Sequence, residues 1–515
     1  MNLLAMKSKG IIYYALFLLA ATGCQEENND GITENAPFFY LQDDELRIGD
    51  NLKDTLRIST SHELQALERT IRLCSEEIPS EIPFTIDTLY KTGDNEYAIV
   101  FSDRGTMDVY NYPVTLQFSQ TGTGTVASSD TFHIYKSFFT ELPVVFINTP
   151  KEAEIVSKED WLEGTELKIY DGKGNLNYNG IIEIKGRGNT TWSFPKKPYA
   201  LKLEEKSEIL GMPKHKRWVL LANYLDKTLM RNHIAFFLAQ SEGISLEWTP
   251  RGKFVDVVLN GKHNGCYYLC EQIKIDENRI HIHENTPEDI DGGFLLEFDT
   301  NFDEANKFYS SVKKLPVMVK EPDEDDLTPD QFSFIQDYIN NIDKILYASD
   351  FAETRQYEEF IDVQTFVDYY FIYELTGNSE LNWPKSCYMY RDKGGKLKAG
   401  PVWDFDYATF GPFYDYFRQG ASETGIWWFS RLHEVPAVQQ LRAERWNILY
   451  PSFYKVLDEV ERTRSLIHKS AEINSDLWPI TGTDPNKEKT LSFDEAVDRL
   501  RNNLKEQIEW LNNNI

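Results

Sequence analysis

Two aspartates separated by one residue offer the clearest chemistry in this sequence. Asp404 and Asp406 lie in the apolar stretch GPVWDFDYATFG, residues 400–411. A carboxylate in apolar surroundings is costly unless it is paired or bound to a cation. On a strand, both side chains would point to the same face and could share a metal ion. The alternatives are a turn cap for one aspartate and a salt bridge for the other, and we favour metal binding or catalysis.

A basic loop that contains glycine is the second candidate. It reads GRGNTTW at residues 186–192, and PKKPYALKL follows at residues 195–203. Two glycines beside Arg187 let the backbone come close to a ligand. Backbone N–H groups, Arg187 and the lysines that follow could hold phosphates, and Lys202 could reach a cleft from the next strand. The pattern alone favours a tight hairpin with a solvated basic rim, but the run stands out in an acidic chain.

The third candidate is the polar loop TGNSELNWPKS, residues 376–386. It follows the helical pattern DVQTFVDYYFIYEL, which Gly377 can end as a C-cap. A loop after a helix that carries Asn, Glu and Lys is a good place for catalytic groups. Its carboxylate is Glu380. An ordinary polar loop is an equally acceptable interpretation.

Other chemistry has less support in the sequence. Asn223, Arg231 and Glu271 each fit a structural ion pair or cap better than a reacting group. The nine histidines form no triad and no HExxH motif, and no nucleophile elbow is present. Cys266 and Cys270 are too far apart on an extended strand for a disulfide, and no CxxC or Cys/His metal spacing occurs.

The elements that must position these residues change in type along the chain. From residue 141 to about 325, apolar strand patterns dominate, interrupted by one helical pattern at residues 225–241 that Asp226 can cap. Helical spacing then takes over, and the last helix opens with a capping box, Ser492-x-x-Glu495. A strand-rich half followed by a helix-rich half predicts an α+β fold with one lobe of each type. Ligands often bind between such lobes.

The first 140 residues differ in character from the rest. Residues 37–140 carry seven or so short strand patterns between turn clusters, which predicts an all-β, antiparallel sandwich of immunoglobulin-like (Ig-like) type. Residues 24–36 are polar and indicate a tether. Residues 1–23 combine basic residues with a short apolar run, which is typical of a signal peptide. Cys24 at the first mature position indicates a lipoprotein that is lipidated at this cysteine, with a plain signal peptide or a short membrane anchor as alternatives.

Composition limits the possible classes of function. The 515 residues are 41% hydrophobic and 14% aromatic, which excludes wholesale disorder and allows two or more domains. Lys and Arg number 54 against 82 Asp and Glu, for a net charge of −28. Such a surface argues against broad nucleic-acid binding, which needs cations along the phosphates. It leaves room for a local basic pocket that binds a phosphorylated ligand.

Taken together, these stretches resemble the CotH family of spore-coat-type secreted protein kinases. Five stretches occur in the family's order between residues 140 and 515: GRGNTTW with PKKPYALKL, NYLDKTLMRNHIAFFLA, GCYYLCEQI, the GNSE loop and GPVWDFDYATFG. The resemblance implies an atypical protein-kinase-like, two-lobed domain at residues 141–515. It also implies transfer of the γ-phosphoryl group of ATP to protein hydroxyls, with Mg²⁺ or Mn²⁺.

The resemblance further implies roles for individual residues. Asp404 would hold the metal, as the DFG aspartate does in ordinary kinases, and Asp406 would assist it or orient the loop. Glu380 would accept the proton of the substrate hydroxyl. The residues implied in binding the nucleotide are Arg187, Asn189, Lys197, Lys202 and Glu271.

The sequence departs from the family pattern in the third loop, and three functions stay open. Glu380 replaces the aspartate of the family's Asn-x-Asp, and Ser386 stands where the family often has a metal-holding asparagine. We favour an exported kinase that is lipid-anchored in the cell envelope and phosphorylates a protein, with no nucleic-acid partner. The alternative is an inactive pseudokinase that serves as a surface binding or adhesion lipoprotein, suggested by the exposed-looking pair Trp427 and Trp428. The third is a two-carboxylate glycosidase, in which the basic loop would have no role.

Overall fold

The structure is a computed structural model that describes most of the chain. The described residues are 39–43, 45–48, 53–61, 63–64, 70–74, 84–103, 111–119, 126–136, 140–173, 175–411 and 427–515. The expected signal peptide, Cys24 and the tether lie outside them. The chain divides into two compact units, and the larger one contains His133–Ile515. Helices and strands occur together, so the α+β class is confirmed.

The described residues before 137 form strands in two sheets. One sheet has the order β1-β3-β6-β5, and the other has the order β2-β9-β7-β4, with β8 paired to β7. Buried and exposed positions alternate through β3, as expected for a strand with one face in a core. One pair, β2 with β9, is parallel, which differs from the all-antiparallel prediction. The strands are β1 Phe39–Leu41, β2 Glu45–Ile48, β3 Lys53–Thr60, β4 Thr70–Cys74, β5 Phe84–Gly93, β6 Glu96–Asp103, β7 Asn111–Ser119, β8 Val126–Ser128 and β9 Phe132–Lys136.

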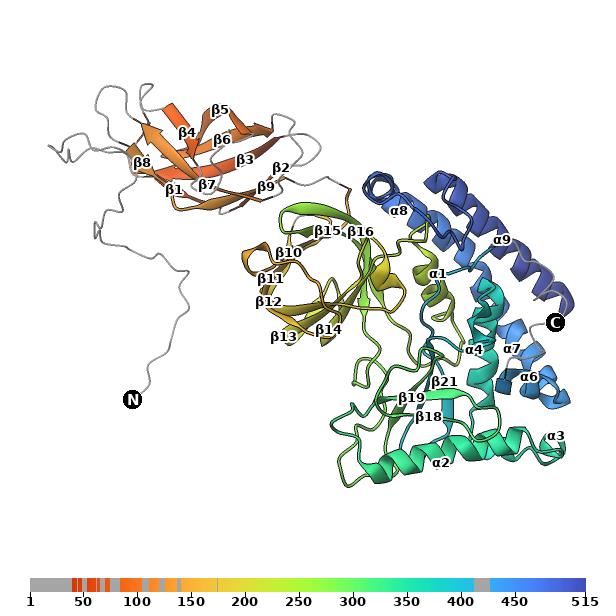
Figure 1. The fold of residues 1–515 in the computed structure, drawn as a ribbon. Helices are drawn as coiled ribbons and strands as arrows, with labels where there is room; N and C mark the ends of the chain where they lie inside the picture. Colours follow the sequence, from red (N-terminus) through yellow and green to blue (C-terminus); the bar gives the residue numbers. More distant parts are fainter. Residues whose placement is uncertain are drawn as a thin grey trace, which may run out of the picture. The chain divides into compact units, whose positions relative to one another are not determined.

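The strand-rich half of the larger unit is a closed barrel (Figure 1). Its order is β10-β11-β12-β13-β14-β16-β15, and β10 closes it by pairing in parallel with β15. Alternate residues point inward, and large side chains such as Leu201, Leu203 and Trp218 form its core. The sequence patterns predict the strands but not this closure. The strands are β10 Val144–Asn148, β11 Leu162–Tyr170, β12 Leu176–Gly186, β13 Tyr199–Ile209, β14 Met212–Leu221, β15 Gly252–Leu259 and β16 Lys262–Glu271.

A second sheet of the larger unit has the order β18-β19-β17-β20-β21. Helix α2 (Pro329–Leu346) packs against it through ring contacts of Phe332 and Phe334 with Phe308 and Phe294. This places α2 beside the sheet (Figure 1). The strands are β17 Phe294–Phe298, β18 Lys307–Tyr309, β19 Pro316–Glu321, β20 Cys387–Arg391 and β21 Leu397–Ala399.

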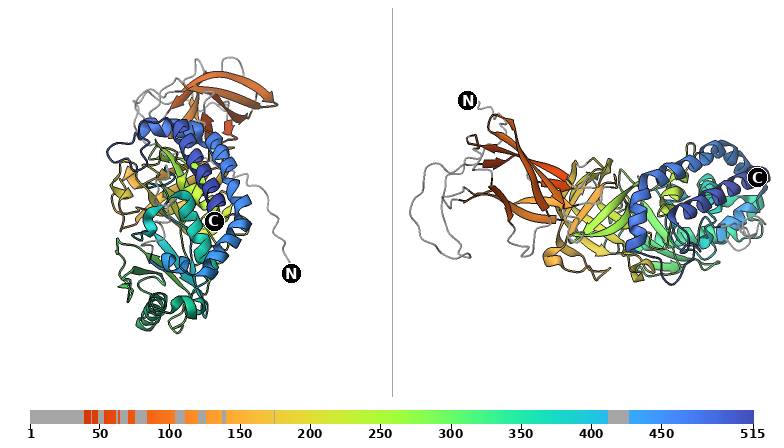
Figure 2. Two further views of the ribbon diagram at one scale, coloured as in Figure 1. Left: turned by 90° about the vertical axis from the view of Figure 1, so that its right-hand side faces the viewer. Right: turned by 90° about the horizontal axis from the view of Figure 1, so that it is seen from above.

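The remaining helices gather on one side of the larger unit, with α8 and α9 side by side (Figure 2). Helix α4 is buried almost throughout. Trp427 and Trp428, expected at the surface, are 1% and 0% exposed, because they pack on Phe298 in the core. Within the described ranges, no helix combines the length and the apolar character that crossing a bilayer requires. The helices are α1 Arg231–Leu238, α3 Phe351–Thr354, α4 Val363–Thr376, α6 Trp427–His433, α7 Pro436–Tyr454, α8 Val456–Leu477 and α9 Phe493–Asn514.

Local signals for helix ends are confirmed at two positions and wrong at a third. The capping box of Ser492 is present at the start of α9, and Gly377 ends α4 with a φ of +64°. Asp226 does not cap a helix, because α1 begins five residues later, at Arg231. Its carboxylate instead accepts the N–H groups of Thr228 and Arg231 and so holds the turn before the helix.

A buried histidine near the end of α6 makes folding sensitive to acid. His433 packs against the ring of Tyr370, with 4.6 Å between ring centroids, and no residue that the structure describes forms a hydrogen bond with its Nδ1. Burial, and then the charge of Arg442, lower the pKa of His433 to about 3. The unfolded chain therefore binds the proton more readily, with a histidine pKa of about 6.5. The buried, neutral His433 therefore contributes fully to the free energy of unfolding above about pH 6.5. This contribution is lost as the pH falls toward 3.

We therefore expect the melting temperature to fall between pH 7 and pH 4, and to fall less in His433→Phe. Circular dichroism melts at each pH measure this difference, and the neutral-pH melt of the variant shows whether the ring is accommodated. Parallel curves for the two proteins would contradict the assignment.

Candidate active site

The three candidate stretches meet in one polar cavity of about 600 Å³ in the larger unit. Residues of the barrel, of the second sheet and of the loops after α4 and β21 line it. Both positive and negative side chains line it, so it suits a ligand that carries both phosphates and cations. Its charged lining residues are Lys158, Glu159, Lys185, Arg187, Lys196, Glu297, Asp299, Asp303, Glu304, Lys320, Glu380, Lys385, Asp404 and Asp406.

The basic loop places an unpaired arginine in this cavity. Strand β12 ends at Gly186, where a Cβ would lie 2.3 Å from the ring of Trp192, and Gly188 has a φ of +82°. Only glycine fits both positions without strain. The guanidinium of Arg187 lies 5.2 Å from the ring centroid of Trp403, and its side chain has no hydrogen bond or ion pair with any described residue. Its five N–H donors are available to a ligand.

The acidic pair lies on an irregular loop and not on a strand. Strand β21 ends at Ala399, and Asp404 has a φ of +65°. The two carboxyl groups still lie close enough for each to shift the pKa of the other. Burial raises the pKa of Asp404, and burial and the charge of Asp404 raise the pKa of Asp406 well above its usual range. The sequence predicted that both carboxylates lie on one face of a strand. They do lie close together, but a bend in the loop brings them there.

Glu380 lies in a single 3₁₀ turn, Ser379–Leu381, that follows the C-cap of α4. The side chain of Asn378 accepts the Glu380 N–H at 2.9 Å and sets the direction of the turn. Burial, and then the charge of Asp404, raise the pKa of Glu380 to about 9. Its buried Oε2 has no hydrogen-bond partner among the described residues. Lys385 lines the same cavity without an ion pair to a described residue, and its charge opposes these shifts.

These acidic residues fit a divalent cation. Burial raises the pKa of all three carboxyl groups, and the charge of Asp404 raises the pKa of Glu380 and Asp406 further, so positive charge would stabilise this site. Across the described residues, no group of three or more His, Cys, Asp and Glu is arranged to hold a metal by itself. Mg²⁺ commonly binds one or two carboxylates and completes its shell with water and substrate phosphates. The donor set therefore fits a cation that arrives with a phosphorylated ligand.

The structure brings some of the predicted binding residues to the cavity and leaves others outside. Asn189 lies at its rim, where it accepts from Lys158 and donates to Asp303. Three others do not line the cavity. Lys197 donates to the carbonyl of Trp192, Lys202 pairs with Glu183 at 2.9 Å, and the buried Glu271 pairs with Arg251 at 2.8 Å.

Two lysines that line the cavity were not singled out from the sequence, although Lys196 belongs to the basic stretch. Lys320 of β19 pairs with Glu297 at 3.2 Å and with Glu304, and these carboxylates raise its pKa despite burial. The sequence signal that could have identified Lys320 is a lysine directly after the apolar run PVMV. Lys196 is fully buried, donates to Ala222 and Asn474, and has a pKa lowered to about 7 by burial. Nothing in PKK distinguishes it from its neighbour.

Comparison with known families agrees with the geometry. The family model described as CotH kinase protein matches residues 184–511, which include the basic loop, Glu380 and the acidic pair. A comparison with curated proteins gave no match.

Proposed function

Since the chain belongs to the CotH kinase protein family, we propose that it transfers the γ-phosphoryl group of ATP to a hydroxyl group of a protein. The observation that carries the proposal is the meeting of Glu380, Asp404 and Asp406 with the unpaired cations Arg187 and Lys385 in one cavity. Phosphoryl transfer needs positioned cations, a metal site and a group that receives a proton. A glycosidase would leave the two cations without a role.

The unpaired cations would hold the phosphates of ATP. Arg187 offers a planar fork of donors that matches phosphate oxygens, and the ring of Trp403 beneath it limits its motion. Lys385 lies in the same loop as Glu380. It adds a second positive charge to the cavity from a part of the chain that is far from Arg187 in sequence. Neither side chain must first break a direct ion pair with a described residue before it binds the ligand.

Asp404 and Asp406 would hold Mg²⁺ or Mn²⁺. When bound there, the ion would supply positive charge that neutralises the phosphate oxygens. The two carboxylates are fixed close together before the ligand arrives, which reduces the cost of ordering them.

Glu380 would act as the general base. As the hydroxyl oxygen forms its bond to the γ-phosphorus, the bond between that phosphorus and the β,γ-bridging oxygen breaks. The hydroxyl proton passes to Glu380, and ADP leaves with the bridging oxygen. A cation held by Asp404 and Asp406 would offset the charge that raises the pKa of Glu380, so the carboxylate would be ionised when ATP is bound and its Oε2 could take that proton.

The proposal extends to the architecture and location of the protein. The barrel would form one lobe of an atypical kinase-like domain, and the helical half with the second sheet would form the other. The strands before residue 137 would form an Ig-like module. Lipidation at Cys24 would anchor the chain in the cell envelope, where its protein substrate would be found.

The direct test uses residues 25–515 with ATP and Mn²⁺. Intact mass records phosphate on the chain and on added envelope proteins, and calorimetry records ATP binding with and without Mn²⁺. We expect metal-dependent binding and transfer. Binding without transfer to itself or to any added protein would favour the pseudokinase, for which the Glu380 and Ser386 departures are the sequence basis. No ATP binding would overturn the nucleotide proposal.

Arg187→Ala should weaken ATP binding by about 10- to 100-fold, the usual effect of losing hydrogen bonds to a charged group. Lys202→Ala is the matched control, because this cation of the same basic stretch is paired with Glu183 and lies outside the cavity lining. It should bind ATP as the wild type does. Calorimetric titration of both variants measures this, and equal losses would contradict the placement of Arg187.

A further inference from the structure

The loop that carries the acidic pair has a backbone that regular secondary structure does not hold. Three of its residues other than glycine, Asp404, Ala408 and Phe410, have φ values of 65°, 52° and 51°. Such conformations persist only where the surroundings impose them, and they gather at functional sites. Groups from elsewhere in the chain must therefore hold this loop in shape.

One of these groups is the side chain of Asn232, in the first turn of α1. Its Oδ1 accepts the N–H of Phe405 at 2.7 Å. That N–H belongs to the peptide group that directly follows Asp404, so the bond fixes this peptide at the residue with positive φ. Asn232 is 2% exposed and lines the cavity beside the acidic pair.

Asn232 is itself held in one orientation. Its Nδ2 donates to Oδ1 of Asn223 at 3.2 Å. Asn223 in turn donates to the carbonyl of Leu229 at 2.8 Å. With the amide nitrogen used in this way, the oxygen of Asn232 is directed at Phe405, and its side chain has no freedom to turn.

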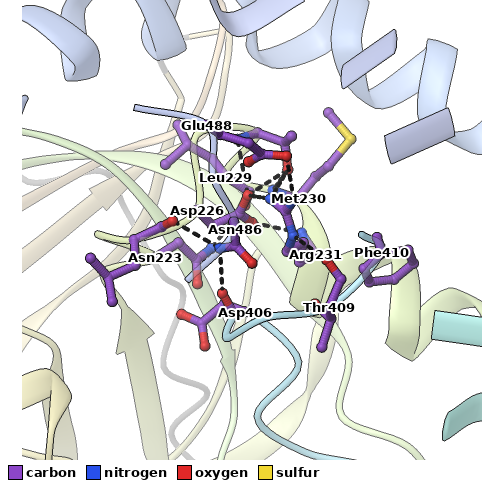
Figure 3. A network of polar contacts seen from close by, with 12 residues as sticks. Asn223, Asp226, Leu229, Met230, Arg231, Asp406, Thr409, Phe410, Asn486 and Glu488 are labelled. Atoms are coloured by element: carbon purple, nitrogen blue, oxygen red, sulfur yellow. Dashed lines mark hydrogen bonds and ion pairs between the residues drawn. The ribbon is translucent and has the colours of Figure 1, made fainter. Parts of the chain in front are cut away.

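Neighbouring contacts fasten the rest of the loop to the same support (Figure 3). Arg231 donates from Nε to the carbonyl of Thr409 at 3.2 Å, and Asn486 donates to the carbonyl of Asp406 at 2.9 Å. Arg231 is 1% exposed and forms ion pairs with the buried carboxylates of Asp226 and Glu488. The start of α1 thus holds the loop at Phe405 and Thr409, and Asn486, from the segment before α9, holds it at Asp406.

We propose that Asn232 is a positioning residue for the acidic pair. By holding the peptide after Asp404, it sets the direction in which the two carboxylates enter the cavity, and so it sets the affinity for the divalent cation. The inference rests on the proposed function for the identity of that cation. The hold of Asn232 on the loop is a property of the protein alone.

The test compares three variants of the full chain by Mn²⁺ calorimetry and by thermal melting. Asn232→Ala removes the acceptor for Phe405. Asn232→Asp keeps an acceptor oxygen for the N–H of Phe405. The negative charge that it adds attracts a cation and so does not by itself weaken cation binding. Asn503→Ala is the matched control, because it removes an asparagine hydrogen bond, 2.9 Å long, to the carbonyl of Phe410 in the same loop.

We expect Asn232→Ala to weaken Mn²⁺ binding by about 10- to 100-fold, the usual cost of losing an outer-shell partner. Asn232→Asp and Asn503→Ala should bind Mn²⁺ near the wild-type affinity, even where their melting temperatures fall. The proposal is overturned if Asn232→Ala binds Mn²⁺ like the wild type, if the aspartate variant is as weak as the alanine variant, or if the control loses as much.

Hydrogen exchange of the wild type gives a second measurement that needs no variant to fold. The amide of Phe405 should exchange slowly without metal or nucleotide, and fast exchange would overturn the proposal. A wild type that binds neither Mn²⁺ nor ATP would refute the proposed function and the role in cation affinity together. Slow exchange in that case would still establish the hold on the loop, so the two failures remain distinguishable.

Discussion

Glu380→Gln will reduce phosphoryl transfer by about 10²- to 10⁴-fold while ATP and Mn²⁺ still bind. This is the usual contribution of a positioned general base. Glutamine keeps the size of the side chain but cannot take the hydroxyl proton. The turn that presents it depends on the backbone N–H of residue 380 bound to Asn378, which the substitution retains. Rates of phosphate incorporation and calorimetric binding, measured on the same preparation, separate the two effects.

Two further variants complete this experiment. Glu380→Asp restores the family's Asn-x-Asp loop and keeps a carboxylate, so it should retain more transfer than the glutamine variant. Glu159→Gln makes the same chemical change at an exposed position of the cavity rim and should leave the rate unchanged. A glutamine variant at position 380 that transfers phosphate at the wild-type rate would exclude Glu380 as the base.

Asp404→Asn should abolish transfer and also weaken Mn²⁺ binding by more than about 100-fold, since loss of an outer-shell partner alone costs 10- to 100-fold. Asparagine tolerates the left-handed conformation of this residue, whose φ is +65°, so the backbone is retained. An alanine at this position would not separate strain from loss of the carboxylate.

The melting temperature gives this variant an internal check. Burial raises the pKa of Asp404, and a neutral side chain relieves its repulsion with Asp406. We therefore expect Asp404→Asn to melt at a higher temperature than the wild type while it loses the cation. Wild-type Mn²⁺ affinity would contradict the metal-binding role. Retained binding in Glu380→Gln and lost binding in Asp404→Asn would together assign the base and the metal site separately.

The predicted helices were found because their signals are local. The capping box at Ser492, the C-cap at Gly377 and the apolar spacing of α2 each depend on residues within a few turns. The residue types able to carry the chemistry of the site could also be recognised in the sequence. A carboxylate in an apolar stretch, or glycines beside an arginine, has few structural explanations, and Arg187, Glu380 and Asp404 do lie in one cavity.

The tertiary structure decided which side chains of a strand face the interior of the barrel. Lys202 looked able to reach a cleft, but its neighbours Leu201 and Leu203 fill the barrel, and Lys202 stands opposite Glu183 on the other face. Barrel closure assigns these faces, and closure depends on strands far apart in sequence. For the same reason the buried Lys196 could not be told from Lys197.

The sequence by itself determined the α+β class, the helix ends with local caps, and the residue types able to hold phosphate and a cation. The tertiary structure decided how those residues meet. The acidic pair lies on an irregular loop that is held by side chains distant in sequence, among them Asn232, more than 170 residues earlier in the chain. Local propensity describes a strand or a helix, but a loop held by distant side chains has no energetic preference of its own until those side chains are in place.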